Sequence, residues 1–213
     1  MTEFPNELTA GYQAFRSTKL PVDADLYAQL AEAGQTPHTM VIACCDSRSS
    51  PEAVFNAQPG EMFVVRNIAN LVPARANNQG RDTVAAAREY AGLVLKVKNI
   101  LVMGHAKCGG IAAALSQEPT ALSPDGFVDG WIESLTPIVD SVKDHHHASQ
   151  VENQLALEHA SVARSVANLR TFPFIEELES EGKLSLCGAW FDISSGQLWV
   201  MDKKNGNFKK IDA

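Results

Sequence analysis

Short apolar runs alternate along this chain with longer segments in which apolar residues recur at helical spacing. Runs of four or five residues that are mostly apolar and bounded by turn-forming residues are typical of buried parallel strands. Such strands are predicted at residues 40–43, 62–65 and 99–103, and a final hairpin at 184–192 and 197–201. Helices are predicted at residues 8–16, 24–33, 84–97, 131–142, 151–169 and 174–181.

The order of these elements predicts the fold class. Strands separated by helices favour an α/β fold with a mostly parallel central sheet of about four strands, a C-terminal antiparallel edge hairpin and flanking helices. We expect residues 1–213 to form a single domain. In it, residues 1–36 form an N-terminal helical arm that breaks at Pro21, and residues 37–213 form the core.

The composition narrows the class of protein. Hydrophobic residues make up 45% of the 213 residues and charged residues 20%, which is ordinary for a well-cored soluble domain. The net charge is −7 and the chain has no basic run, so a nucleic-acid partner is not expected. Since no apolar stretch approaches the ~20 residues of a membrane span and the N-terminus lacks signal-peptide features, we expect a cytoplasmic protein without membrane contact.

Two polar motifs stand where predicted strands end. Cys44-Cys45-Asp46-Ser47-Arg48 follows the first strand, and His105-Ala106-Lys107-Cys108-Gly109-Gly110 follows the third. Because the carboxyl ends of parallel strands meet at one edge, Cys44, His105 and Cys108 are expected to converge there. Thiolate and imidazole groups suit zinc, and three protein ligands leave the open fourth position of a catalytic site. Cys187, a possible fourth ligand, lies inside a predicted strand with no partner ligand nearby.

Asp46 and Arg48 extend the first motif beyond its metal ligand. In an extended segment Cys44, Asp46 and Arg48 would share one face, so that Arg48 could pair bidentately with Asp46. This pairing would keep the carboxylate from taking the fourth metal position and leave it free to accept a proton from metal-bound hydroxide. Gly109 belongs to a glycine pair that lets the backbone approach a small ligand closely.

These motifs, in this order, resemble those of β-class carbonic anhydrases. The resemblance continues through nearly the whole chain, in segments 65–73, 87–91, 168–173 and 188–192. It implies one Zn²⁺ per subunit on Cys44, His105 and Cys108, with Asp46 and Arg48 as the catalytic pair. The implied reaction is reversible hydration of CO₂ to bicarbonate and a proton by zinc-bound hydroxide. The implied assembly is a homodimer or dimer of dimers, with N-terminal helices packed on the partner and active sites at the interface.

The resemblance also suggests a subgroup and its substrate pocket. The positions matching pocket residues of the open-site, plant-type enzymes are Gln35, Phe63, Ile68 and Tyr90. A second subgroup binds inhibitory bicarbonate through a Trp, an Arg and a Tyr, where this chain has Val41, Arg66 and Phe191. We therefore expect an open zinc site at neutral pH and no such bicarbonate pocket.

Two alternative functions keep the same zinc site. One is hydrolysis of carbon disulfide or carbonyl sulfide, and the other is a catalytically silent zinc-binding protein. Direct assays with each substrate separate them. His145-His146-His147 is interpreted as a polar loop or helix start, because adjacent histidines on a helix point in different directions.

Overall fold

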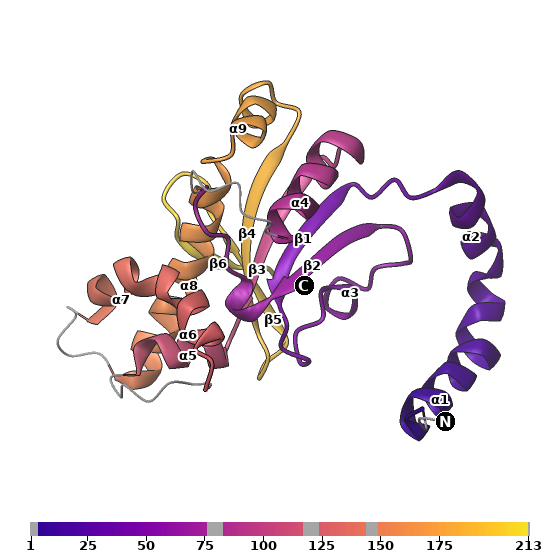
Figure 1. Cartoon of the computed structure of the whole chain (residues 1–213), viewed down its shortest axis with the longest axis horizontal. Helices are drawn as coiled ribbons and strands as arrows, with labels where there is room; N and C mark the ends of the chain where they lie inside the picture. Colours follow the sequence, from indigo (N-terminus) through magenta and orange to yellow (C-terminus); the bar gives the residue numbers. More distant parts are fainter. Residues whose placement is uncertain (1–3, 76–82, 117–123, 144–148, 213) are drawn as a thin grey trace.

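A six-stranded sheet forms the centre of the computed structural model, which describes residues 4–75, 83–116, 124–143 and 149–212. Its strand order is β2-β1-β3-β4-β5-β6 (Figure 1). The strands are β1 (Thr39–Cys44), β2 (Met62–Asn67), β3 (Asn99–His105), β4 (Ser185–Asp192), β5 (Gln197–Met201) and β6 (Phe208–Lys210). Strands β1 to β4 run parallel to one another, β5 runs antiparallel to β4, and β6 runs antiparallel to β5. This arrangement confirms the predicted α/β class. Strand β6 was not predicted, because its three residues carry no recognisable apolar run.

The helices are α1 (Asn6–Ala14), α2 (Leu20–Ala33), α3 (Pro51–Val54), α4 (Thr83–Glu89), α5 (Gly109–Leu115), α6 (Phe127–Ile132), α7 (Thr136–Lys143), α8 (Gln150–Leu169) and α9 (Pro173–Ser180). Short π-helical segments follow α1 (Phe15–Lys19) and α4 (Tyr90–Val94), and 3₁₀ turns lie at Ile68–Asn70 and Glu133–Leu135. Helices α5, α6 and α7 gather on the side of the sheet away from α1 and α2 (Figure 1). No described helix is long and apolar enough to cross a membrane.

The N-terminal arm is one continuous helical rod, so the break expected at Pro21 does not occur. Pro21 lies in the first turn of α2, where its missing N–H costs little. Just before it, the Leu20 N–H reaches the Phe15 carbonyl across a wide π-helical turn that makes room for the ring. The arm extends away from the sheet (Figure 1), and neither α1 nor α2 contains a buried residue.

Close packing between α8 and the sheet sets the position of β3 and β4. A Cβ added to Gly104 would lie 2.6 Å from Val162 Cγ2, and one added to Gly188 would lie 2.9 Å from Val162 Cγ1. The two glycines therefore form the surface on which the fully buried Val162 of α8 rests. Gly104 immediately precedes His105, so this contact also locates the end of β3.

One expectation from the sequence lies outside the described residues, namely the polar loop or helix start at the histidine tract 145–147. The helix predicted at 131–142 is found as the end of α6, a 3₁₀ turn and α7. The predicted helix at 84–97 ends earlier, in the π-helical segment that closes at Val94.

Candidate metal centre

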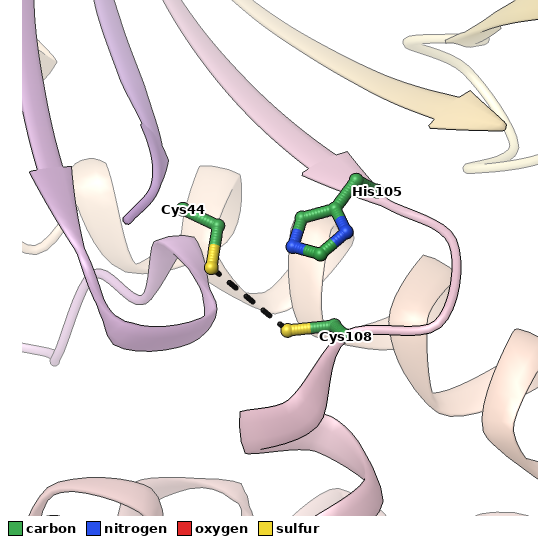
Figure 2. Close-up of side chains that lie close together, drawn as sticks. All are labelled: Cys44, His105 and Cys108. Carbon is green, nitrogen blue, oxygen red and sulfur yellow. Dashed lines mark hydrogen bonds between the residues drawn. The ribbon is translucent and has the colours of Figure 1, made fainter. Parts of the chain in front are cut away.

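Two parallel strands bring the candidate ligands together. Cys44 is the last residue of β1 and His105 the last of β3, and these strands are direct neighbours. Cys108 follows on the turn into α5, where it is the N-cap. The three ligand atoms all lie within 4.8 Å of one another, and the two sulfurs are 4.0 Å apart (Figure 2). All three residues are buried, so the expected convergence is found.

The hydrogen bonding of His105 leaves one ring nitrogen for a cation. Its Nδ1 lies 2.8 Å from the Ala106 carbonyl oxygen, which can only accept, so Nδ1 carries the proton. Its Nε2 is buried without a hydrogen-bond partner. An unpartnered buried nitrogen is costly unless a metal ion or proton occupies it. The donor set of two sulfurs and this nitrogen therefore fits a zinc ion.

The electrostatics of the cluster also favour a cation. The hydrogen bond from Cys108 lowers the pKa of Cys44 to about 4, against the opposing effect of burial. The same contact with Cys44, together with burial, raises the pKa of Cys108. Cys44 is therefore the sulfur that gives up its proton more readily, and a divalent cation would displace the proton of Cys108 as well. Burial lowers the pKa of His105, but contacts with Cys44 and the Ala106 carbonyl outweigh that effect and raise it.

Asp46 and Arg48 form the expected bidentate pair beside the cluster. Arg48 Nε donates to Asp46 Oδ1 at 2.9 Å, and Nη2 donates to Oδ2 at 2.6 Å. Asp46 Oδ2 lies 3.9 Å from His105 Nε2. The side-chain bonds from Arg48 hold the pKa of Asp46 well below its usual range.

The geometry of this pair differs from the extended segment that we expected. The Arg48 N–H donates to Asp46 Oδ1 at 2.9 Å, and the Ser49 N–H donates to the Asp46 carbonyl at 3.1 Å. These are the bonds of a tight Asx turn, in which an aspartate side chain closes the turn on the backbone two residues later. The pairing thus comes from a turn that folds Arg48 back, and the backbone itself helps to hold the carboxylate.

Arg66 anchors the cysteine motif from the neighbouring strand. Its Nε donates to the Cys44 carbonyl at 2.8 Å and its Nη2 to the Asp46 carbonyl at 2.6 Å. The guanidinium fork therefore spans the backbone on both sides of Cys45. This arrangement fixes the spacing between the candidate metal ligand Cys44 and the carboxylate of Asp46.

Glu158 of helix α8 holds the backbone of Cys108 by a hydrogen bond. Its Oε1 accepts the Cys108 N–H at 3.0 Å, and its Oε2 accepts the Trp190 Nε1–H at 3.0 Å. Burial raises the pKa of Glu158, while the hydrogen bonds from Cys108, Gln154 and Trp190 oppose that shift. Glu158 also lines a cavity of about 390 Å³, together with Trp190, Lys107 and other residues.

The comparisons with known proteins agree with these features. The carbonic anhydrase family model matches residues 39–198 of the chain, which include every proposed metal ligand. Beta carbonic anhydrase 3 of Arabidopsis thaliana is 37% identical over 201 residues, covering 92% of this chain and 77% of that protein. The chain belongs to the β-carbonic anhydrase family. Members of this family are carbonate dehydratases, enzymes that hydrate CO₂.

Solved β-carbonic anhydrases share the fold. The structure of the β-carbonic anhydrase CcaA superposes with a TM-score of 0.88 at 28% identity, covering 97% of this chain and 92% of that one. One of two tetrameric β-carbonic anhydrases from Sordaria macrospora gives a TM-score of 0.77 at 27% identity, covering 97% and 96%.

The substrate-pocket residues expected of a β-carbonic anhydrase separate into two groups. Ile68 and Gly109 lie near the candidate ligand Cys108. Gly109 follows Cys108 directly, and a Cβ added to the next residue, Gly110, would meet Ile68 Cγ2 at 2.9 Å. Phe63 and Tyr90 contact each other, with ring centroids 5.9 Å apart, and Tyr90 is 45% exposed. Phe63 precedes the carboxyl end of β2 by four residues, about 13 Å along a strand. Gln35 is exposed in the segment between α2 and β1.

Sequence reasoning missed the supporting role of Glu158. A signal was present, because Glu158 falls on the same helical face as the apolar Val162 and Leu169 of the predicted helix. A carboxylate on the inward face of an amphipathic helix is unusual and points to a buried hydrogen-bond network. Arg66 was noted only in relation to bicarbonate binding, and its bonds to two carbonyl groups could not be read from its position.

Proposed function

We propose that this protein catalyses the zinc-dependent, reversible hydration of carbon dioxide to bicarbonate and a proton. The observation that carries the proposal is the buried cluster of Cys44, His105 and Cys108, in which His105 Nε2 has no hydrogen-bond partner. Two cysteines and a histidine are a known ligand set of catalytic zinc. A zinc ion held there would lower the pKa of a water molecule and so supply the nucleophile near neutral pH.

The surrounding residues would act on the water and the substrate. Asp46 stays ionised throughout the neutral range because Arg48 engages both of its carboxylate oxygens. It can therefore accept a hydrogen bond from the water and orient an oxygen lone pair toward CO₂. Since Arg48 and the backbone satisfy this carboxylate, we propose that it does not become a metal ligand and that the site stays open at neutral pH, as in the plant-type subgroup.

We infer that the active protein is a homodimer or a dimer of dimers. Support comes from the arm, which buries none of its own residues, and from the tetrameric state of the Sordaria macrospora relatives. Gln35, Phe63 and Tyr90 would then lie at a subunit interface. There they would complete the substrate pocket of the neighbouring subunit and not the pocket of their own subunit. A cytoplasmic location is proposed as well, because zinc ligation requires reduced thiols and all four cysteines are free.

The test combines metal content with stopped-flow CO₂ hydration. We expect one zinc per chain and a hydration rate far above the buffer reaction, rising with pH above neutrality. Asp46→Asn preserves the shape of the side chain but weakens its acceptor, so its rate should fall by roughly 100-fold. Asp140→Asn, an exposed aspartate on α7, is the matched control and should retain full activity.

Other results would reject or redirect the proposal. A wild-type protein with bound zinc and no rate above buffer would be a silent zinc-binding protein. Faster turnover of carbonyl sulfide or carbon disulfide than of CO₂ would assign it to those hydrolases. In the described part of the chain, no observation favours either alternative.

A further inference from the structure

Glu158 is the only aspartate or glutamate that is buried in the described part of the chain. It is 3% exposed and lies on the inward face of α8. An isolated carboxylate in such a place is strongly disfavoured unless hydrogen bonds compensate it. Here three N–H donors do so, from Cys108, Gln154 and Trp190. A carboxylate retained at this depth has a specific structural task, and its partners identify that task.

The first partner is the backbone of a proposed zinc ligand. Cys108 is the N-cap of α5, but its side chain makes no capping hydrogen bond. An N-cap residue usually uses its side chain to hold the first turn of its helix. The sulfur of Cys108 faces Cys44 instead, and Glu158 Oε1 holds the Cys108 N–H from another helix at 3.0 Å. Helix α8 thus fixes the backbone while the sulfur remains available to a metal.

The second partner links this contact to the strand beside His105. Glu158 Oε2 accepts from Trp190, which is the register partner of Gly104 in the β3–β4 ladder. One residue further along, the Ala106 N–H donates to the Phe191 carbonyl at 2.9 Å. A single carboxylate therefore connects the backbone of Cys108 with the strand that holds His105 in place.

Gln154 completes the network one turn earlier in α8. Its Nε2 donates to Glu158 Oε1 at 3.0 Å and lies 3.4 Å from the Cys108 carbonyl. The peptide groups on both sides of the Cys108 Cα are thereby held from α8. This matters because the preceding residue, Lys107, has a left-handed backbone with a φ of 54°, which is uncommon for a residue with a side chain.

We propose that Glu158 is a positioning residue for the zinc site, which sets Cys108 relative to His105 and Cys44 without touching the metal or the substrate. The inference rests on the proposed function in taking zinc as the ion. Both oxygens of Glu158 face N–H donors, so the position requires an acceptor at each. Glutamine has the same shape but offers one acceptor and one NH₂ group, which must then face a donor.

The experiment measures zinc affinity directly, by competition with a chelator of known affinity in the purified full-length protein. Loss of a hydrogen bond that supports a ligand costs roughly 10- to 100-fold in metal affinity. We expect Glu158→Gln to bind zinc about tenfold more weakly than the wild type. The cobalt-substituted variant should show an altered visible spectrum, since the position of one thiolate has changed. Glu176→Gln, an exposed glutamate on α9, is the control and should titrate like the wild type.

A second substitution separates positioning from general destabilisation. Trp190→Phe removes the indole donor that the glutamine NH₂ would oppose. In the Glu158→Gln background it should restore part of the lost zinc affinity, although alone it weakens binding slightly. Should Glu158→Gln fail to fold, Trp190→Phe and Gln154→Leu each remove one bond to the carboxylate, and both should lower zinc affinity.

The outcomes are distinct from those that test the function. Zinc titrations of Glu158→Gln that match the wild type within twofold, with an unchanged cobalt spectrum, would overturn the inference. So would normal affinity in both Trp190→Phe and Gln154→Leu. A wild type that binds zinc but does not hydrate CO₂ would instead reject the proposed function. The zinc titrations of Glu158→Gln would then still decide whether Glu158 positions the zinc site. A wild type that binds no zinc would reject both.

Discussion

At the scale of single residues, the pair of Asp46 and Arg48 decides what the candidate site can do. A carboxylate 3.9 Å from His105 Nε2 could itself become a metal ligand. Arg48 engages both oxygens in a fork that only arginine can form, and we propose that this keeps the carboxylate from a metal. The charge of Arg48 alone would not suffice, because the geometry determines which way the oxygens face.

Replacing Arg48 with lysine tests this distinction. Arg48→Lys keeps the positive charge but loses the fork, so we expect kcat/KM for CO₂ hydration to fall by roughly 10- to 100-fold. In the wild type, the pKa of Asp46 is held below its usual range. In Arg48→Lys it would rise toward the ordinary value near 3.9, which is still below the pH range of the assay. The pH–rate profile between pH 6 and 9 should therefore fall in height without shifting its midpoint.

The chain contains a matched control for this substitution. Arg170 makes an equivalent bidentate pair with Glu179, with bonds of 2.6 and 2.8 Å, and it is similarly exposed. Arg170→Lys should leave hydration unchanged. Full activity in Arg48→Lys, or a midpoint displaced by a whole pH unit, would show that the fork is not what controls Asp46.

The convergence of the candidate metal ligands could be predicted from the sequence, because each lies at or just after the end of a strand. Cys44 and His105 directly close apolar runs, and the parallel pairing of those runs brings their ends together. Glu158 could not be assigned in the same way. It lies fifty residues beyond Cys108, and only the packing of α8 against the sheet brings the two together. Residues that support a ligand through its backbone leave a weaker trace in the sequence than the ligand itself.

At the scale of elements, the closeness of α8 to the sheet determines where the site lies. Gly104 and Gly188 stand on adjacent strands, and Val162 of α8 rests against both. The same helix carries Glu158 one turn earlier, so a shift of α8 would move the support of Cys108. The packing of one valine on two glycines is thus connected to the geometry of the proposed metal ligands.

A methyl group at Gly104 should separate α8 from the sheet. The added Cβ would lie 2.6 Å from Val162 Cγ2, and neither the helix nor the central strand can move freely. We expect Gly104→Ala to destabilise the protein by about 1–3 kcal/mol, measured as a lower urea midpoint at fixed protein concentration. Adding Val162→Ala should recover part of the loss by removing the opposing methyl groups.

Gly130→Ala serves as the comparison for this pair. A Cβ at Gly130 meets nothing within 4 Å, and the residue lies within α6, where alanine is favoured over glycine. This variant should be as stable as the wild type or more stable. If Gly104→Ala were equally harmless, the close approach of α8 would not be a constraint on the fold.

Strands β1 to β5 and the main helices followed from apolar periodicity, but some local features did not. Pro21 was expected to break the arm, yet it occupies a first helical turn after a π-helical segment. Nothing in a periodic pattern distinguishes a proline that starts a helix from one that ends it when the turn before it can widen. Strand β6 was missed because pairing with β5, and not its own composition, makes it a strand.

At the scale of the whole molecule, the N-terminal arm is exposed along its length, since neither α1 nor α2 contains a buried residue. Leu8 and Tyr12 lie one turn apart on α1, and Phe4 stands four residues before Leu8, just ahead of the helix; they are 55%, 58% and 66% exposed. A stripe of large apolar side chains on an extended helix is unfavourable in water and typical of an interface. We therefore expect this stripe to pack on a second copy of the chain.

Charges placed in the stripe should disrupt that assembly. The double variant Leu8→Glu/Tyr12→Glu would bury two carboxylates at the interface, so we expect the oligomer to dissociate into monomers in analytical ultracentrifugation. Gln13→Glu adds a charge to an exposed position of the same helix and should leave the oligomer intact. If Gln35, Phe63 and Tyr90 complete a pocket in the neighbouring subunit, the monomer should retain its zinc and yet lose most of its CO₂ hydration. A monomer with full activity would show that each site is complete within one chain.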